Sequence, residues 1–139
     1  MSLFNVFNIT GSGMQAQSMR LNTTASNIAN ADSVSSSIDQ AYRARYPVFA
    51  AAMQKAADGQ ESNVGVQVLG IVESNKPLSV EYAPEHPMAD KDGNIYKPNV
   101  NVIEEMTNMI SASRSYQTNV QVAESAKNML TKTLTLGQR

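Results

Sequence analysis

The residues of this sequence that could take part in chemistry are few and scattered. His86 is the only histidine and the chain has no cysteine, so neither a histidine–cysteine zinc site nor a serine–histidine–aspartate set can be completed. Residues 90–94 (DKDGN) resemble the start of a calcium loop, but the third oxygen ligand before the glycine is missing, and the sequence predicts a turn. Glu104 and Glu105 are adjacent and would diverge by about 100° on a helix, which suits a helix N-terminus better than an acid–base pair. We expect no catalytic residue, no metal and no cofactor.

The composition narrows the class of protein further. Of the 139 residues, 42% are hydrophobic and 17% are charged, which is typical of a folded domain. The net charge is −1 and the basic residues are scattered, so we expect no nucleic-acid partner. No stretch reaches the roughly 20 apolar residues of a membrane span, so we expect no direct membrane insertion. No basic residue precedes Arg20 and no apolar run of signal-peptide length follows, so we expect any export to proceed without a cleaved signal.

The N-terminal segment, residues 1–33, has a helical apolar period. Two rows with a seven-residue spacing lie side by side and predict a coiled-coil-like stripe. Ser12 and Gln15 form a possible capping box, so we expect the main helix to start near Gly13, and the sequence leaves open whether a short helical turn at residues 3–10 joins it. The stretch SNIANADS at residues 26–33 is rich in residues that compete with helix, and predicts its end. The rows consist of Phe7, Met14, Leu21 and Ile28, and of Phe4, Gly11, Ser18 and Ala25.

The C-terminal segment, residues 99–139, has the stronger helical pattern. Apolar residues recur at heptad spacing for more than four heptads, which predicts one helix over residues 101–136. Asn101 and Glu104 supply a start of capping-box type, and Gly137 is a natural stop. The rows are Val102, Met109, Tyr116, Ala123 and Leu130, interleaved with Met106, Ser113, Val120, Lys127 and Leu134.

The middle of the chain, residues 34–98, has a different pattern. Residues 34–42 are polar and predict a loop, and the alternation in VGVQVLGIVES predicts a strand. PLSVEY predicts a second, shorter strand, and residues 92–94 (DGN) predict a hairpin turn that leads into Ile95 and Tyr96. The β-rich part, residues 43–98, has about 55 residues and few large apolar groups, so it is near the lower limit for an independent core.

These patterns predict a mainly α fold with a small β-rich insert, in which the two terminal helices pair as an antiparallel, coiled-coil-like hairpin. A lone hairpin would be marginal, because the roughly 18 kcal/mol of gross apolar burial that the C-terminal helix offers is largely cancelled by side-chain ordering and incomplete burial. The longer helix also has apolar length that the shorter one cannot cover. We therefore expect assembly with other chains. The expected subunit-interface residues are Phe4, Phe7, Met14, Leu21, Ile28, Val102, Met106, Met109, Tyr116, Val120, Leu130 and Leu134.

Two stretches resemble a known family. QAQSMRLNTTASNIANADS at residues 15–33 resembles the N-terminal signature that flagellar rod and hook proteins share. The stretch from HPMADKDGN to TLTLGQ, residues 86–138, is similar to the C-terminal half of proximal rod members of that family. The resemblance implies a non-enzymatic axial protein that leaves the cell through the flagellar type III export apparatus as a largely unfolded chain.

The same resemblance implies how the subunits would be arranged. Copies of the chain and other rod or axial proteins would stack as a helical tube that crosses the periplasm and transmits torque. The paired terminal helices would form the inner layer of this tube. SNIANADS would then mark the point where the chain leaves that layer and enters the β-rich insert.

Two other classes of protein compete with this interpretation. A soluble helical export chaperone or adaptor would also clasp a partner with two helices, but it would be folded and dimeric when purified alone. An enzyme that cleaves the cell wall would need a paired acid and base, which the sequence does not supply.

Overall fold

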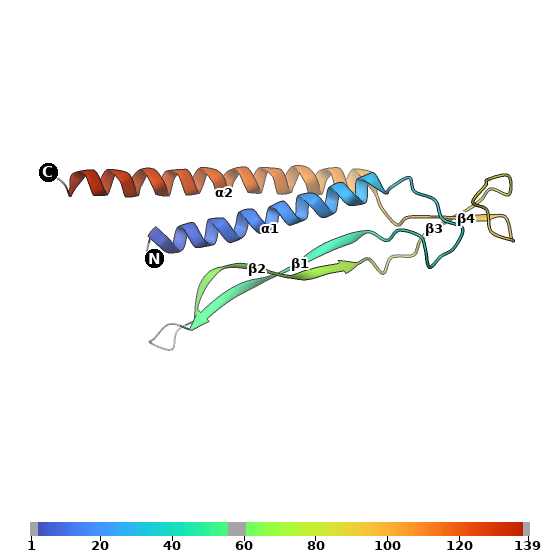
Figure 1. The fold of residues 1–139 in the computed structure, drawn as a ribbon, viewed down its shortest axis with the longest axis horizontal. Coiled ribbons are helices and arrows are strands. Elements are labelled where there is room, and N and C mark those ends of the chain that lie inside the picture. The colour runs from blue at the N-terminus through green and yellow to red at the C-terminus, as the bar shows by residue number, and fades with distance from the viewer. Residues whose placement is uncertain (1–2, 56–60, 138–139) are drawn as a thin grey trace. The chain divides into compact units, whose positions relative to one another are not determined.

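A computed structural model describes residues 3–55 and 61–137 of the chain, without the side chains of residues 3–4, 53–55 and 61–64. Helix α1 (Leu3–Ala29) comes first and helix α2 (Val102–Leu136) last. Between them lie β1 (Arg45–Lys55), β2 (Glu61–Glu73), β3 (Ser79–Tyr82) and β4 (Asn94–Lys97) (Figure 1). The predicted mainly α fold with a β insert is confirmed. Neither helix, over its described residues, is long and apolar enough to cross a membrane.

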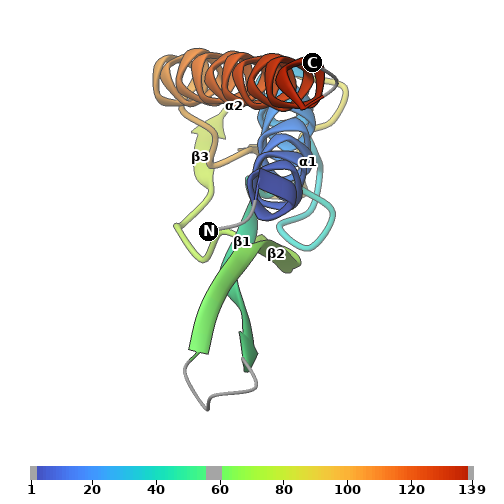
Figure 2. The same cartoon turned by 90° about the vertical axis from the view of Figure 1, so that its left-hand side faces the viewer.

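The chain divides into two compact units that both contain parts of α1, α2 and the β1–β2 sheet. The first unit consists of residues 1–19, 48–70 and 111–139, and the second of residues 20–47 and 71–110. In the first unit, α1 lies between α2 and the β1–β2 sheet (Figure 2). The second unit contains the end of α1, the start of α2 and the β3–β4 sheet.

Helix α1 is continuous through its glycines, so the predicted start near Gly13 is wrong. The hydroxyl of Ser12 donates to the carbonyl of Ile9 at 2.9 Å, as a serine inside a helix does, and accepts from the backbone N–H of Val66 at 3.1 Å. Packing of Ser12 against β2 thus replaces the expected capping role. The predicted end is confirmed, because α1 stops at Ala29 and the side chain of Asn30 donates back to the carbonyl of Ser26 at 2.8 Å.

Helix α2 confirms the prediction for residues 101–136 to within one residue. The Asn101 side chain caps its start by accepting from the backbone N–H groups of Ile103 at 3.1 Å and Glu104 at 3.4 Å. At the other end, the N–H of Gly137 donates to the carbonyl of Thr133 at 3.1 Å.

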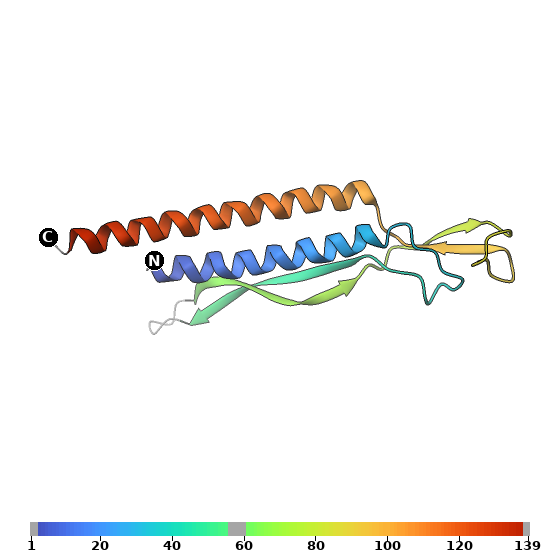
Figure 3. The same ribbon diagram turned by 45° about the horizontal axis from the view of Figure 1, so that its top comes forward.

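The β insert contains two separate two-stranded sheets, β1–β2 and β3–β4. Strands β2, β3 and β4 confirm the predicted strands, whereas β1 was not predicted because its AAAM stretch has low β propensity. Strands β3 and β4 are antiparallel, with Ser79 opposite Lys97 and Tyr82 opposite Asn94 (Figure 3). Gly93, with a φ of +78°, closes a turn as expected. That turn ends an 11-residue connection rather than forming a tight hairpin.

The buried residues of both units are mostly small or polar. In the first unit the buried apolar side chains are Ala16, Ala112 and Ala126. In the second they are Ala41, Ala44 and Ile95. Among the described residues, the largest side chains that are fully buried are Asn27 and Glu105.

Candidate assembly interface

The face of α2 that packs inside the units is not the one with the largest apolar residues. Glu105, Ala112 and Ala126 are buried, and with half-buried Asn119 they form a row with a seven-residue spacing. This seven-residue spacing is present in the sequence, but a prediction that ranks the rows of α2 by the size of their apolar residues selects other rows. Consequently, the larger apolar side chains of α2 stay on its outer faces.

In the first unit, α1 approaches α2 closely at a glycine. A Cβ atom placed on Gly13 would lie 3.0 Å from Nδ2 of Asn119, so any side chain there would have to displace that amide. Gly11 has open space at the corresponding position. The two glycines therefore have different roles, and only Gly13 permits the close approach of the helices.

A shallow apolar groove of about 360 Å³ runs along the same unit. Val122 and Met129 are large apolar residues in its wall, and they are 43% and 57% exposed. The groove contains no charged side chain and therefore favours an apolar partner. Its lining residues are Val6, Thr118, Gln121, Val122, Ser125, Ala126 and Met129.

In the second unit, a polar junction holds the end of α1 against the start of α2 and the start of β1. Asn27 is completely buried and its amide uses all of its hydrogen-bonding capacity. Its Nδ2 donates to the carbonyl of Arg45 at 2.9 Å and to Oε2 of Glu105 at 3.0 Å. Its Oδ1 accepts from the backbone N–H of Arg45 and from the hydroxyl of Tyr42, both at 2.9 Å. One side chain thus fixes three segments of the chain.

The Glu105 carboxylate is the charged member of this polar junction and is only 1% exposed. Its Oε1 atom is buried and has no hydrogen-bond partner among the described residues. Burial raises the pKa of Tyr46 to about 12, and a side-chain hydrogen bond to Glu105 and the charge of that carboxylate act in the same direction. The junction therefore keeps the Tyr46 phenol protonated.

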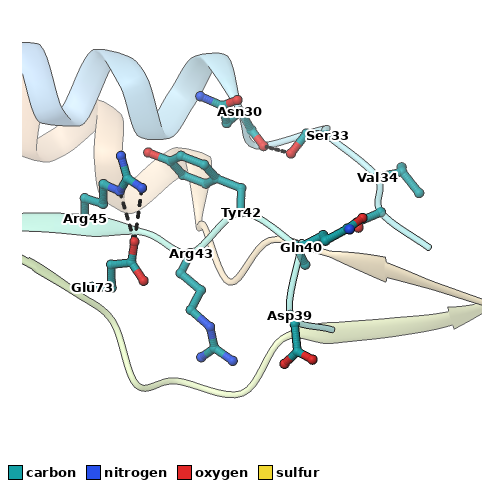
Figure 4. A pocket seen from close by; sticks show the side chains of 11 residues that line it. Asn30, Ser33, Val34, Asp39, Gln40, Tyr42, Arg43, Arg45 and Glu73 are labelled. Carbon is teal, nitrogen blue, oxygen red and sulfur yellow. Dashed lines mark hydrogen bonds and ion pairs between the residues drawn. The ribbon is translucent and has the colours of Figure 1, made fainter. Parts of the chain in front are cut away.

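Arg45 connects the junction to a polar hollow of about 520 Å³. Its guanidinium forms an ion pair with Glu73 at 3.1 Å and lies 5.6 Å from the centre of the Tyr42 ring. In Figure 4 these groups face one another, whereas the Arg43 side chain points away from them. The Arg45–Glu73 pair is half exposed, so we assign it little stability.

A second asparagine joins the loops of the same unit. Asn99 Oδ1 accepts from the backbone N–H of Ala44 at 2.8 Å, and its Nδ2 donates to the carbonyl of Lys76 at 2.7 Å. Lys76 also forms an ion pair with Glu104 at 3.7 Å. Glu104 and Glu105 thus face different partners, and they do not form an acid–base pair.

The residues first considered for chemistry occupy local turns. The Nδ1 atom of His86 accepts from the backbone N–H of Met88 at 3.1 Å, and Oδ1 of Asp90 accepts from that of Lys91 at 2.7 Å. Among the described residues, no group of three histidine, aspartate or glutamate side chains could hold a metal ion.

The residues expected at a subunit interface lie on partly accessible surfaces. Phe4 lies outside the described side chains. Because the structure contains one chain, the contacts of all these residues with other subunits remain a prediction. Val102, Met106, Tyr116 and Leu134 are exposed, Leu134 to 63%. The half-buried members are Phe7, Met14, Leu21, Ile28, Met109, Val120 and Leu130. Sequence periodicity missed an exposed pair beside them, Ile103 (78%) and Ile110 (54%).

Comparison with known proteins identifies two matching families. Residues 7–35 match the family described as flagella basal body rod protein, and residues 91–136 match the C-terminal region of flagellar basal body rod FlgEFG proteins. These segments contain the N-terminal signature, the polar end of α1 and most of α2.

Full-length relatives agree with these matches. The flagellar basal-body rod protein FlgC of Salmonella typhimurium is 50% identical over 138 residues, which cover 99% of this chain and all of the relative. FlgC proteins of Escherichia coli O6:H1 and Yersinia enterocolitica are 50% and 51% identical with the same coverage. The chain therefore belongs to the FlgC family of flagellar basal-body rod proteins.

Proposed function

We propose that the chain is a structural subunit of the proximal rod of the bacterial flagellar basal body, and not an enzyme. It polymerises through α1 and α2 into a helical tube that transmits torque. Its sequence identity of 50–51% with rod proteins named FlgC, over 99% of its length, is the observation that carries this proposal.

The distribution of apolar side chains supports a role in assembly. Ile103, Met106 and Ile110 are each more than half exposed on the first turns of α2, and Leu134 and Leu136 are exposed on its last turns. Burying one such side chain against a neighbour contributes about 1.5–3 kcal/mol. Several copies packed together would therefore gain stability that a single chain lacks.

The terminal helices form the inner domain in this proposal, from residues 1–33 and 99–139, paired as an antiparallel coiled-coil-like hairpin. Two contacts support the antiparallel direction within the second unit: Arg20 donates to Asn108 at 2.9 Å, and Asn27, further along α1, contacts Glu105, earlier on α2. The small residues on the inner rows allow close packing, and the outer rows remain for neighbouring subunits.

The proposed partners are copies of the same chain, other rod and axial proteins, and the flagellar type III export apparatus. The chain would reach the rod without a cleaved signal peptide and form part of the shaft that crosses the periplasm. An exposed apolar surface suits a subunit that becomes ordered when it joins a growing end.

Complementation tests the proposal directly. We expect this chain to restore swimming to a Salmonella strain that lacks its own FlgC, and to be recovered in purified basal bodies. Replacing Leu130 with Glu should abolish swimming and recovery in basal bodies while export into the medium continues, because a charge would have to be buried between subunits.

A matched variant controls for the added charge. Gln117→Glu adds a carboxylate at an exposed position of the same helix, outside the apolar groove, and should swim if only the interface matters. Normal rods in the Leu130→Glu variant would remove that residue from the interface. Absence of the unaltered chain from basal bodies, despite export, would overturn the proposed function itself.

A further inference from the structure

The contact between Asn27 and Glu105 differs from the rest of the packing between α1 and α2. These are the two largest fully buried side chains in the described part of the chain, both are polar, and they are joined by a hydrogen bond of 3.0 Å. The other buried side chains on the facing sides of the two helices are small, such as Ala16 and Ala112. Small side chains fit against one another in several registers, so they fix the position along the helix axis weakly.

The lengths and heptad repeats of the helices allow α1 to shift along α2 by one heptad in one direction, which we call a slip. Helix α2 has 35 residues and α1 has 27, so α2 is longer by eight residues (35 minus 27). A slip of seven residues, about 10.5 Å along the axis, would bring Ala112 opposite Asn27 in place of Glu105. A slip in the opposite direction would leave Asn27 beyond α2, which begins at Val102. Of the two slips by one heptad, only the first therefore leaves Asn27 packed against α2.

We propose that the buried Asn27–Glu105 pair is a register lock that selects the observed alignment of α1 on α2. In the slipped register, Asn27 would face Ala112 and could not donate to a carboxylate. Glu105 would lose the bond that Asn27 donates to its Oε2 atom, and the Asn27 amide would keep a buried N–H group without that acceptor, which is unfavourable. The Arg20–Asn108 hydrogen bond would be lost as well, whereas the small residues could still pack against one another, so polar contacts carry the discrimination between the registers.

The geometry of the pair favours specificity over stability. Oε1 of Glu105 is buried without a partner among the described residues, so the pair is not arranged to maximise stability. Replacing a buried polar pair with apolar residues of similar volume is often neutral or stabilising. If the pair acted only as structural support, replacing it with apolar residues would lower the thermal stability of the chain. The inference concerns two helices of one chain and does not depend on assembly into a rod.

Chemical cross-linking of the purified full-length chain can test the lock. The chain has no cysteine, so pairs introduced by mutation have no competing thiols. Arg20→Cys with Asn108→Cys reports the observed register, because these two side chains are in contact at 2.9 Å. Arg20→Cys with Ser115→Cys reports the slipped register, because Ser115 follows Asn108 by seven residues. A short bis-maleimide traps either alignment, even where it is formed only part of the time.

With the lock intact, we expect cross-linking of the 20–108 cysteine pair to be at least about tenfold faster than cross-linking of the 20–115 pair. In an Asn27→Leu/Glu105→Leu background the ratio should fall towards one, with no loss of thermal stability. The matched control, an Asn22→Leu/Thr107→Leu background, also introduces two leucines, but at exposed positions of the same helices, and it should leave the ratio unchanged.

A relocated lock gives a second, independent result. In a Glu105→Ala/Ala112→Glu background the carboxylate moves by seven residues, and we expect the slipped pair to become the faster one. An unchanged preference for the observed register in both the leucine variant and the relocated variant would overturn the inference. That result would leave the proposed rod function intact, because the cross-linking does not involve assembly.

Discussion

At the scale of single residues, the polar junction depends on the chemistry of one amide. Asn27 donates twice and accepts twice, and its partners belong to three segments. No other side chain of similar size has both the donors and the acceptors in this arrangement. The sequence marked residues 26–33 as the end of a helix, but it did not show that one of those asparagines is buried.

Asn27→Asp should disrupt the junction more than its similar size suggests. The carboxylate would lose both donated bonds and lie next to Oε2 of Glu105, and each unsatisfied buried group costs about 1–3 kcal/mol. We expect loss of swimming in the complemented strain and little of the variant in purified basal bodies. Asn22→Asp, at an exposed position of the same helix, should behave like the unaltered chain, and equal defects in both would argue against a specific role of Asn27.

Tyr46 gives the junction a dependence on alkaline pH. Its pKa is about 12 in the folded chain and 10.0 in an unperturbed tyrosine, so folding favours the protonated phenol. The stabilisation from this group is present below pH 10 and is lost as the pH rises towards 12. We expect Tyr46→Phe subunits to stay in purified basal bodies over this range when unaltered subunits are released. Identical release curves, measured by sedimentation and quantitative blotting, would rule out this role for Tyr46.

At the scale of elements, heptad spacing predicted the helices but not which face they would share. The sequence favoured rows with Phe7, Met14 and Leu21, whereas the contacts involve Gly13, Arg20 and Asn27. Small side chains allow the helix axes to approach, and apolar size gives no information about that approach. The break predicted near Gly13 failed for a related reason, because packing against α2 and β2 compensates for the low helix propensity of glycine.

Gly13 and Gly11 provide a matched test of this close approach. Gly13→Leu should push α1 away from Asn119 and cost about 1–3 kcal/mol, because the helices are already in contact there. Gly11→Leu meets open space and should be neutral or stabilising, because leucine has the higher helix propensity. Recovery of each variant in basal bodies gives the comparison. Equal recovery would show that the α1–α2 spacing adjusts freely at Gly13.

At the scale of the whole molecule, the chain buries little large apolar surface of its own. The buried apolar residues include five alanines and one isoleucine among the described residues, whereas many valine, leucine, isoleucine and methionine side chains are exposed. We expect such a chain to gain much of its order from neighbours. Family membership gives those neighbours an identity in the flagellar basal body.

Hydrogen exchange of the purified subunit tests how much order a single chain has. We expect poorly protected amides in residues 1–30 and 101–136 at micromolar concentration, because the paired helices alone are close to marginal. Strong protection of both segments in a proven monomer would contradict dependence on neighbours. Strong protection in a dimer would instead favour the chaperone or adaptor class.

The sequence by itself determined the two helices, the end of α1, most of the strands and the family, because these depend on periodicity and on local residue types. It could not predict β1, whose run of alanines has little intrinsic preference for a strand. Only the tertiary structure decided which helix faces meet and that Asn27 and Glu105 are buried together. Burial of a polar side chain depends on partners that lie 78 residues apart in the sequence, and local patterns contain no information about such pairs.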